Sequence, residues 1–417
     1  MAKIYINPTP AGSVLEQEKS LVQNLNTLSM DLSNVQRNLR YKIAAQEQIS
    51  ASLTEVISQV IKEKTAVNAL KDGLAEIIEH YKKSESINIE KLVAITAALT
   101  KTSYNRPTGQ ELVDASSEEK DKFIKEFEKE NPKLARIFDE FLSGGKNNTL
   151  TENDIRNMKY LAYNADEPFR TIFLNSLSKF SIGNCDMDEG AFYRQFFHTV
   201  NFTYDDSLNK DSFGNDPRGP YTTFFHECGH AIDDLSDVSK WWGSDTEKFT
   251  AHSDVIGRDV TLREAIEYDV YYNTNNPHSM TSLANEIKAS GVPGSNGNVE
   301  NVIAALQSGV TSKLVTNEDL KLYNAVLHQH QRTTGSSAQY ESVSDVYGGM
   351  SNNALRTNYG HSAEYWTDKT MAAKELWAEY FAYNMSGSME NLEHLLEYFP
   401  EAAKVMEQYA NTLGGQF

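Results

Sequence analysis

Residues 224–234 read FFHECGHAIDD and contain the pattern H-E-x-x-H, with His226, Glu227 and His230 at its fixed positions. On an α-helix, residues four positions apart lie on one face, about a turn from each other. Two imidazoles at this spacing can hold one Zn²⁺, and the glutamate between them then lies beside the metal. The stretch therefore predicts a helix that carries part of a metal site suited to the hydrolysis of peptide bonds.

Two histidines do not complete such a site. A catalytic zinc site has three protein ligands and leaves a fourth position to water. The metzincin extension of the pattern would require glycine at position 233 and histidine at position 236, where this chain has Asp233 and Ser236. The third ligand must therefore come from another part of the chain.

The best candidate for the third ligand is Glu375, in the segment KELWAEYFAYN at 374–384, which reads as a helix. Glu379 lies one turn further along the same face, and Ala378 and Ala382 share that side. Small residues would let this helix approach the zinc helix closely, and Glu379 is expected to accept the second ring N–H of a histidine ligand. Three other residues remain rivals of Glu375 as the ligand: Glu379, Asp345 and His361.

A family resemblance rests on these segments. HECGHAIDD followed at a distance by ELWAEYFA resembles the zinc peptidase domain of anthrax lethal factor and its toxin relatives, where an H-E-x-G-H-x-x-D helix is completed by the first glutamate of an E-x-x-A-E helix. The segments VSDVYGG at 343–349 and YGHSAEYW at 359–366 also resemble metallopeptidase-like domains at the ends of phage head proteins and in bacterial polymorphic toxins. The resemblance covers residues 180–410 and departs in the 144 residues between His230 and Glu375.

The resemblance implies a gluzincin that binds zinc through His226, His230 and Glu375. Zinc would lower the pKa of its water toward neutrality, and Glu227 would take the proton and pass it to the leaving amine. The resemblance also implies a tyrosine shortly before the ligand helix that stabilises the oxyanion. Tyr359 is expected in this role, and the alternatives are Tyr365 and His361.

Composition excludes several classes of partner. The 417 residues suggest two or three domains, and the formal net charge of -19 argues against nucleic acid or an anionic membrane as the main partner. No stretch approaches the roughly 20 apolar residues of a membrane span. The first residues, MAKIYINPTPAG, lack the pattern of a cleavable signal peptide, so export is expected to be leaderless. The two cysteines, Cys185 and Cys228, predict no disulfide framework.

Residues 13–85 predict two long helices with a break in residues 41–52, because apolar residues recur at three- and four-residue spacing. The two helices would form an antiparallel hairpin. It resembles the WXG-type hairpins that lead proteins into type VII secretion, and Tyr81–Glu85 fits the Y-x-x-x-D/E tail of that family. The W-x-G turn is absent, and a spacer or oligomerisation arm is the alternative. This hairpin is expected to bind a secretion partner, a chaperone or an immunity protein.

The expected fold is mainly α, with an α+β catalytic domain. We expect the hairpin in residues 1–90, a helical connecting region in residues 91–179, and a gluzincin-like zinc peptidase domain in residues 180–417. A strand at 199–204 predicts a small sheet beside the H-E-x-x-H helix. His328 and His330 are expected at the surface.

The leading functional hypothesis is a zinc-dependent endopeptidase that acts on a peptide or protein substrate and is secreted as a bacterial effector or toxin. One alternative is a catalytically silent or structural metal-binding component of a phage particle or injection apparatus, which would be particle-associated. Another is that the H-E-x-x-H pattern arose by chance in a helical interaction protein.

Overall fold

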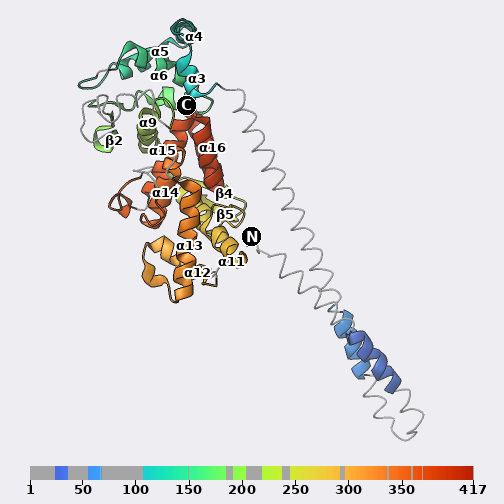
Figure 1. Cartoon of the computed structure of the whole chain (residues 1–417). Helices are drawn as coiled ribbons and strands as arrows, with labels where there is room; N and C mark the ends of the chain where they lie inside the picture. Colours follow the sequence, from blue (N-terminus) through green and yellow to red (C-terminus); the bar gives the residue numbers. More distant parts are fainter. Residues whose placement is uncertain are drawn as a thin grey trace. The chain divides into compact units, whose positions relative to one another are not determined.

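The chain divides into two compact units, residues 1–105 and 106–417. The computed structural model describes residues 24–35, 55–65, 67, 107–148, 150–184, 191–202, 218–236, 245–291, 296–335, 338–357, 360–368 and 370–416 (Figure 1). In the first unit, 24–35 and 55–65 are helical, as the apolar spacing predicts. The break expected in 41–52 and the Tyr81–Glu85 tail lie outside the described residues.

The second unit is mainly helical with two small sheets. Its α-helices are α3 (Gly109–Asp114), α4 (Ser117–Glu130), α5 (Pro132–Leu142), α6 (Glu152–Asn164), α7 (Phe169–Ser176), α9 (Thr222–Leu235), α10 (Leu262–Glu267), α11 (Met280–Ala289), α12 (Val299–Ser308), α13 (Asn317–Thr334), α14 (Glu341–Ser351), α15 (Met371–Ser386), α16 (Met389–Tyr398) and α17 (Pro400–Gly414). Short 3₁₀ or π segments are η1 (Gln195–Phe197), η2 (Asp245–Glu247), η3 (Tyr268–Tyr272), η4 (Thr311–Lys313), η5 (Ala338–Tyr340) and η6 (Tyr365–Thr367). The strands are β1 (Ser181–Ile182), β2 (Phe192–Arg194), β3 (Thr199–Asn201), β4 (Thr250–Ser253) and β5 (Arg258–Thr261).

Several helices begin at a threonine that satisfies their first backbone N–H groups. Thr151 caps α6 in a capping box with Asp154, and Thr261 does the same for α10 with Glu264. In each pair the threonine hydroxyl accepts from the backbone of the acidic residue, whose carboxylate accepts from the threonine N–H. The sequence thus fixes where these helices start.

The three-stranded sheet has the order β1-β3-β2 and lies against α9. β1 runs parallel to β3, with Ser181 opposite Thr199, and β2 runs antiparallel to β3, with Tyr193 opposite Val200. The strand expected at 199–204 is therefore present as the central strand, although shorter. β4 and β5 form a separate antiparallel pair.

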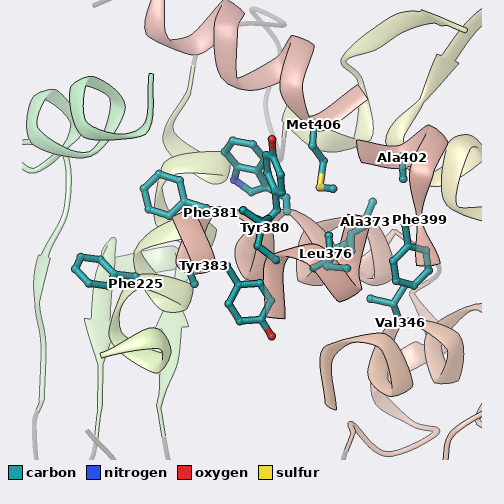
Figure 2. Close-up of a cluster of buried hydrophobic side chains, with 14 of the residues drawn as sticks. Phe225, Val346, Ala373, Leu376, Tyr380, Phe381, Tyr383, Phe399, Ala402 and Met406 are labelled. Atoms are coloured by element: carbon teal, nitrogen blue, oxygen red, sulfur yellow. The ribbon is translucent and has the colours of Figure 1, made fainter. Parts of the chain in front are cut away.

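Helix α15 runs through the core of the second unit. Every residue from Glu375 to Ser386 is buried, so the helix has no solvent-facing stripe. Figure 2 shows Leu376 and Phe381 of this helix among side chains of neighbouring elements, including Val346 of α14 and Met406 of α17. A carboxylate on α15 is consequently held inside the protein.

The boundary expected at residue 180 does not separate two compact units. Helices α3 to α7 fall within the expected connecting region, 91–179, yet they belong to the unit 106–417. The reason is packing: α6 and α7 both contact α15, and α7 also contacts α9. The Phe173 ring, for example, lies 5.5 Å from the Phe225 ring of α9, centroid to centroid.

The expectation of two surface histidines on α13 is wrong for His330 and confirmed for His328. His330 is 1% exposed, stacks on Tyr347 and forms a 2.9 Å hydrogen bond between its Nε2 and the Leu355 carbonyl oxygen. It lies one turn after Val326, on the buried face of α13, whereas His328 is exposed. Among the described residues, no helix is both long and apolar enough to cross a membrane.

Candidate metal centre

Helices α9 and α15 cross in very close contact and run in opposite directions. A Cβ atom built on Gly229 would lie 3.0 Å from the Cα atom of Ala378. The indole N–H of Trp377 donates to the Gly229 carbonyl over 3.2 Å. At the other end of the contact, the hydroxyl oxygens of Thr222 and Ser386 lie 3.2 Å apart. The small residues on α15 therefore do allow the close approach that their spacing predicts.

This crossing brings the three expected ligands together. His226 Nε2 lies 3.1 Å from His230 Nε2 and 3.2 Å from Glu375 Oε2. Glu375 Oε1 lies 3.4 Å from His230 Nε2. His226 and Glu375 are buried, and His230 is partly exposed.

The spacing of these atoms fits a zinc ion. Ligand atoms held tetrahedrally at about 2.0–2.1 Å from Zn²⁺ lie about 3.3–3.4 Å from each other. The two imidazole nitrogens lie 3.1 Å apart, and each lies 3.2–3.4 Å from one oxygen of the Glu375 carboxylate, His226 from Oε2 and His230 from Oε1. The donor set of two imidazoles and one carboxylate is also one that catalytic zinc sites use. The residues present thus suit the metal that the sequence implies.

Glu379 lies behind His226 rather than in the trio. Its Oε1 is 3.3 Å from His226 Nδ1 and accepts a 2.8 Å hydrogen bond from Arg218 Nη1. Burial would raise the pKa of Glu379, but the Arg218 guanidinium and His226 lower it to about 2. Glu379 is therefore ionised and stands where an outer carboxylate can orient a ligand histidine.

Asp233, which stands where the metzincin pattern has glycine, anchors the segment after α9. Its Oδ1 accepts from the Thr246 backbone N–H over 2.8 Å and from the Tyr409 hydroxyl over 3.0 Å. Its Oδ2 accepts from the Thr246 hydroxyl over 2.9 Å. The carboxylate therefore ties α9 to η2 and to α17.

A second group of polar side chains adjoins Glu375. Asp345 accepts two hydrogen bonds from His361, one from the backbone N–H over 2.6 Å and one from Nδ1 over 2.8 Å. Ligand-type atoms of Asp345, His361 and Glu375 lie within 4.8 Å of one another. The His361 ring stacks on Tyr365 at 3.9 Å, and the Tyr365 hydroxyl donates to Glu375 Oε1.

The tyrosine expected beside the site, Tyr359, lies outside the described residues, whereas its alternative Tyr365 reaches the ligand Glu375. Burial is the main cause that raises the pKa of Tyr365, and the negative charge of Glu375 adds to it, so the phenol stays protonated and can donate.

Arg218 was not predicted from the sequence, because it precedes His226 by eight residues in a loop without a motif.

Glu227 is buried beside the two histidines. Burial raises the pKa of its carboxyl, and the nearby His226 and His230 oppose that rise. Burial would lower the pKa of His226, yet the carboxylates of Glu379 and Glu375 raise it well above its ordinary value. The site thus holds two different carboxyl groups. Glu227 takes a proton readily, because burial raises its pKa. Burial would also raise the pKa of Glu375, but His230 and His226 hold it well below its ordinary value.

Comparisons with models of protein families, with curated proteins and with solved structures gave no match to this chain.

Proposed function

We propose that residues 106–417 form a zinc-dependent endopeptidase of the gluzincin type. The observation that carries the proposal is the convergence of His226 Nε2, His230 Nε2 and the two oxygens of the Glu375 carboxylate, with nearest separations of 3.1–3.4 Å. Glu227 stands on the same helix between the two histidines. A metal site with this donor set and a buried carboxylate beside it is suited to hydrolysis.

The roles of the residues follow from their positions. A bound zinc ion supplies Lewis-acid chemistry that makes water nucleophilic near neutral pH. Glu227 takes a proton from the attacking water and delivers it to the leaving amine, a task for which a raised carboxyl pKa is favourable. Tyr365 keeps its phenol proton, which it donates to Glu375 in the structure and would turn toward the developing oxyanion during the reaction. Asp345 orients His361, whose ring stacks on Tyr365.

The substitution Glu227→Ala tests this proposal. We expect the full-length variant to bind zinc as the wild type does and to lose cleavage of a broad peptide library. Removal of an exposed glutamate by Glu364→Ala is the matched control and should leave cleavage unchanged. Equal cleavage by Glu227→Ala and wild type would overturn the proposal. A wild-type protein that binds zinc and cleaves nothing in the library would instead favour a structural metal site.

We also propose that the chain acts outside the cell that makes it, as an effector or toxin. The support is the helical character of 24–35 and 55–65 together with the resemblance of residues 13–85 to WXG-type hairpins. In this proposal the hairpin binds a secretion partner, chaperone or immunity protein. Tyr81→Ala should then abolish appearance of the protein in the medium of producing cells, while the intracellular level remains. Unchanged export would contradict it.

A further inference from the structure

We propose that Arg218 is a positioning residue of the metal centre, which holds the Glu379 carboxylate against His226 and thereby fixes the orientation of that ligand. The inference rests on the proposed zinc function. It concerns a residue of the loop before α9 whose guanidinium contacts Glu379. Its basis is a chain of contacts that runs from the loop before α9, through α15, and back to the imidazole of His226 on α9.

The backbone of Arg218 is fixed before its side chain is considered. Its carbonyl oxygen accepts from Asn391 Nδ2 over 3.1 Å, from the Thr222 hydroxyl over 3.2 Å, and from the Ser388 hydroxyl. The next residue, Gly219, has φ +119, and a Cβ atom there would lie 2.7 Å from Ser388 Cβ. Only glycine suits that position. The start of the Arg218 side chain is therefore set by both α9 and α16.

The guanidinium of Arg218 is fixed at its far end as well. Nη1 donates to Glu379 Oε1 and Nη2 donates to the Thr223 hydroxyl, each over 2.8 Å. The side chain is 18% exposed, so these charge-assisted hydrogen bonds are shielded from water. A planar fork held at both nitrogens can define the position of the carboxylate it contacts.

Glu379 depends on this contact. The carboxylate is 6% exposed, and within the described part of the chain its Oε2 has no hydrogen-bond partner. Oε1 accepts the hydrogen bond from Arg218 Nη1 at 2.8 Å and lies 3.3 Å from His226 Nδ1, a close contact that lacks hydrogen-bond geometry. Without Arg218 the carboxylate would lose its strongest tether and its compensating charge. It would then be free to turn away from the ring nitrogen that it faces.

Whether removal of the Arg218 side chain strengthens or weakens zinc binding shows which role the residue has, a positioning role or a purely electrostatic one. Removing a positive charge near a divalent cation strengthens cation binding through Coulomb attraction. Losing the carboxylate that orients a ligand histidine weakens metal binding by about 10–100-fold. We therefore expect Arg218→Met to weaken zinc binding by about 10–100-fold, and Arg218→Lys, which keeps a donor for Glu379, to recover most of the loss.

The experiment is a zinc titration of the full-length chain against a competing chelator. Arg258→Met is the matched control, because Arg258 pairs with Glu264 on an exposed surface, and its affinity should equal that of the wild type. In a double-mutant cycle, Arg218→Met should add little to the loss caused by Glu379→Ala, because both changes break the same contact. Thr223→Val, which removes one anchor of the guanidinium, should cause a smaller loss and serves if Arg218→Met fails to fold.

Three results would overturn the inference. The first is an Arg218→Met variant that folds and binds zinc at least as tightly as the wild type. The second is additivity of the losses caused by Arg218→Met and Glu379→Ala. The third, which applies if only Thr223→Val folds, is an unchanged zinc affinity of that variant. In all three the wild type still binds zinc, so the proposed function survives. A wild type that binds no zinc would overturn both.

Discussion

A Cβ atom on Gly229 would lie 3.0 Å from the Cα atom of Ala378, at the point where α9 and α15 cross. The same atom would lie 3.3 Å from the Ala378 carbonyl oxygen. Both neighbours are backbone atoms of a buried helix, which cannot move aside as a flexible side chain can. The separation of the two helices, and with it the meeting of Glu375 with the histidines, depends on the absence of a side chain at this position.

Substitution Gly229→Val should therefore push the two helices apart. Overpacking of this kind costs about 1–3 kcal/mol, and we expect the free energy of unfolding of the zinc-free protein to fall by that amount. Zinc affinity should fall as well, because the ligands lie on both helices. Lys321→Val, at an exposed position of α13, is the control for placing valine in a helix. Equal stability of the two variants in denaturant titrations would contradict the close contact.

Glu375→Gln tests which carboxylate completes the trio. Loss of an outer partner of a zinc ligand costs about 10–100-fold in affinity, and loss of the ligand's own charge should cost more. We expect Glu375→Gln to weaken zinc binding more than about 100-fold. Asp345→Asn and His361→Ala should change it only a few-fold, because Asp345 is occupied by His361. A larger loss in either of these two variants would assign the third ligand there.

Tyr365→Phe removes the hydroxyl that donates to Glu375. Loss of one oxyanion donor lowers kcat by about 10²–10³-fold, and we expect this fall with little change in KM or zinc content. The kcat of Tyr359→Phe, measured in the same assay, decides between the two tyrosines that the sequence offers as oxyanion donors. Tyr272→Phe, at an exposed position, is the control. A large fall in kcat for Tyr359→Phe with none for Tyr365→Phe would reverse the assignment.

Acid should destabilise the protein through His330. Burial lowers the pKa of His330 to about 4, although its hydrogen bond to Leu355 opposes the shift. An unfolded histidine titrates near about 6.5. The folded state binds this proton less readily, so the stability that the neutral ring contributes is complete above pH 6.5 and is lost as pH falls toward 4.

The size of this loss is roughly 3 kcal/mol for the full shift. His330→Gln keeps a donor near the Leu355 carbonyl but cannot titrate, so its free energy of unfolding should fall less steeply between pH 6.5 and 4. His328→Gln, at an exposed position of the same helix, should follow the wild type. Parallel curves for wild type and His330→Gln would show that the ring does not carry the acid sensitivity.

The site was predictable where local chemistry determines it. The spacing of His226 and His230 requires only a helix, and Ala378 indicated a close partner for it. Glu375 could be proposed because its segment carries small residues on the same side as two carboxylates. Arg218 and Tyr365 could not be assigned in the same way, because their roles arise from contacts with α15 that no local spacing encodes. His330 was misplaced because the two-residue spacing of His328 and His330 places them on different faces of α13 but does not reveal which face is covered.

The order of the ligands along the chain has a consequence for biosynthesis. His226 and His230 leave the ribosome with α9, but 144 further residues must be made before Glu375. At about 5–20 residues per second, this delay is roughly 7–30 s. Throughout that interval the nascent chain lacks one of the three ligand atoms, and α9 lacks the helix against which its Gly229 packs. If the chain is the endopeptidase proposed above, it would thus be unable to attack neighbouring nascent proteins until its own core had been synthesised.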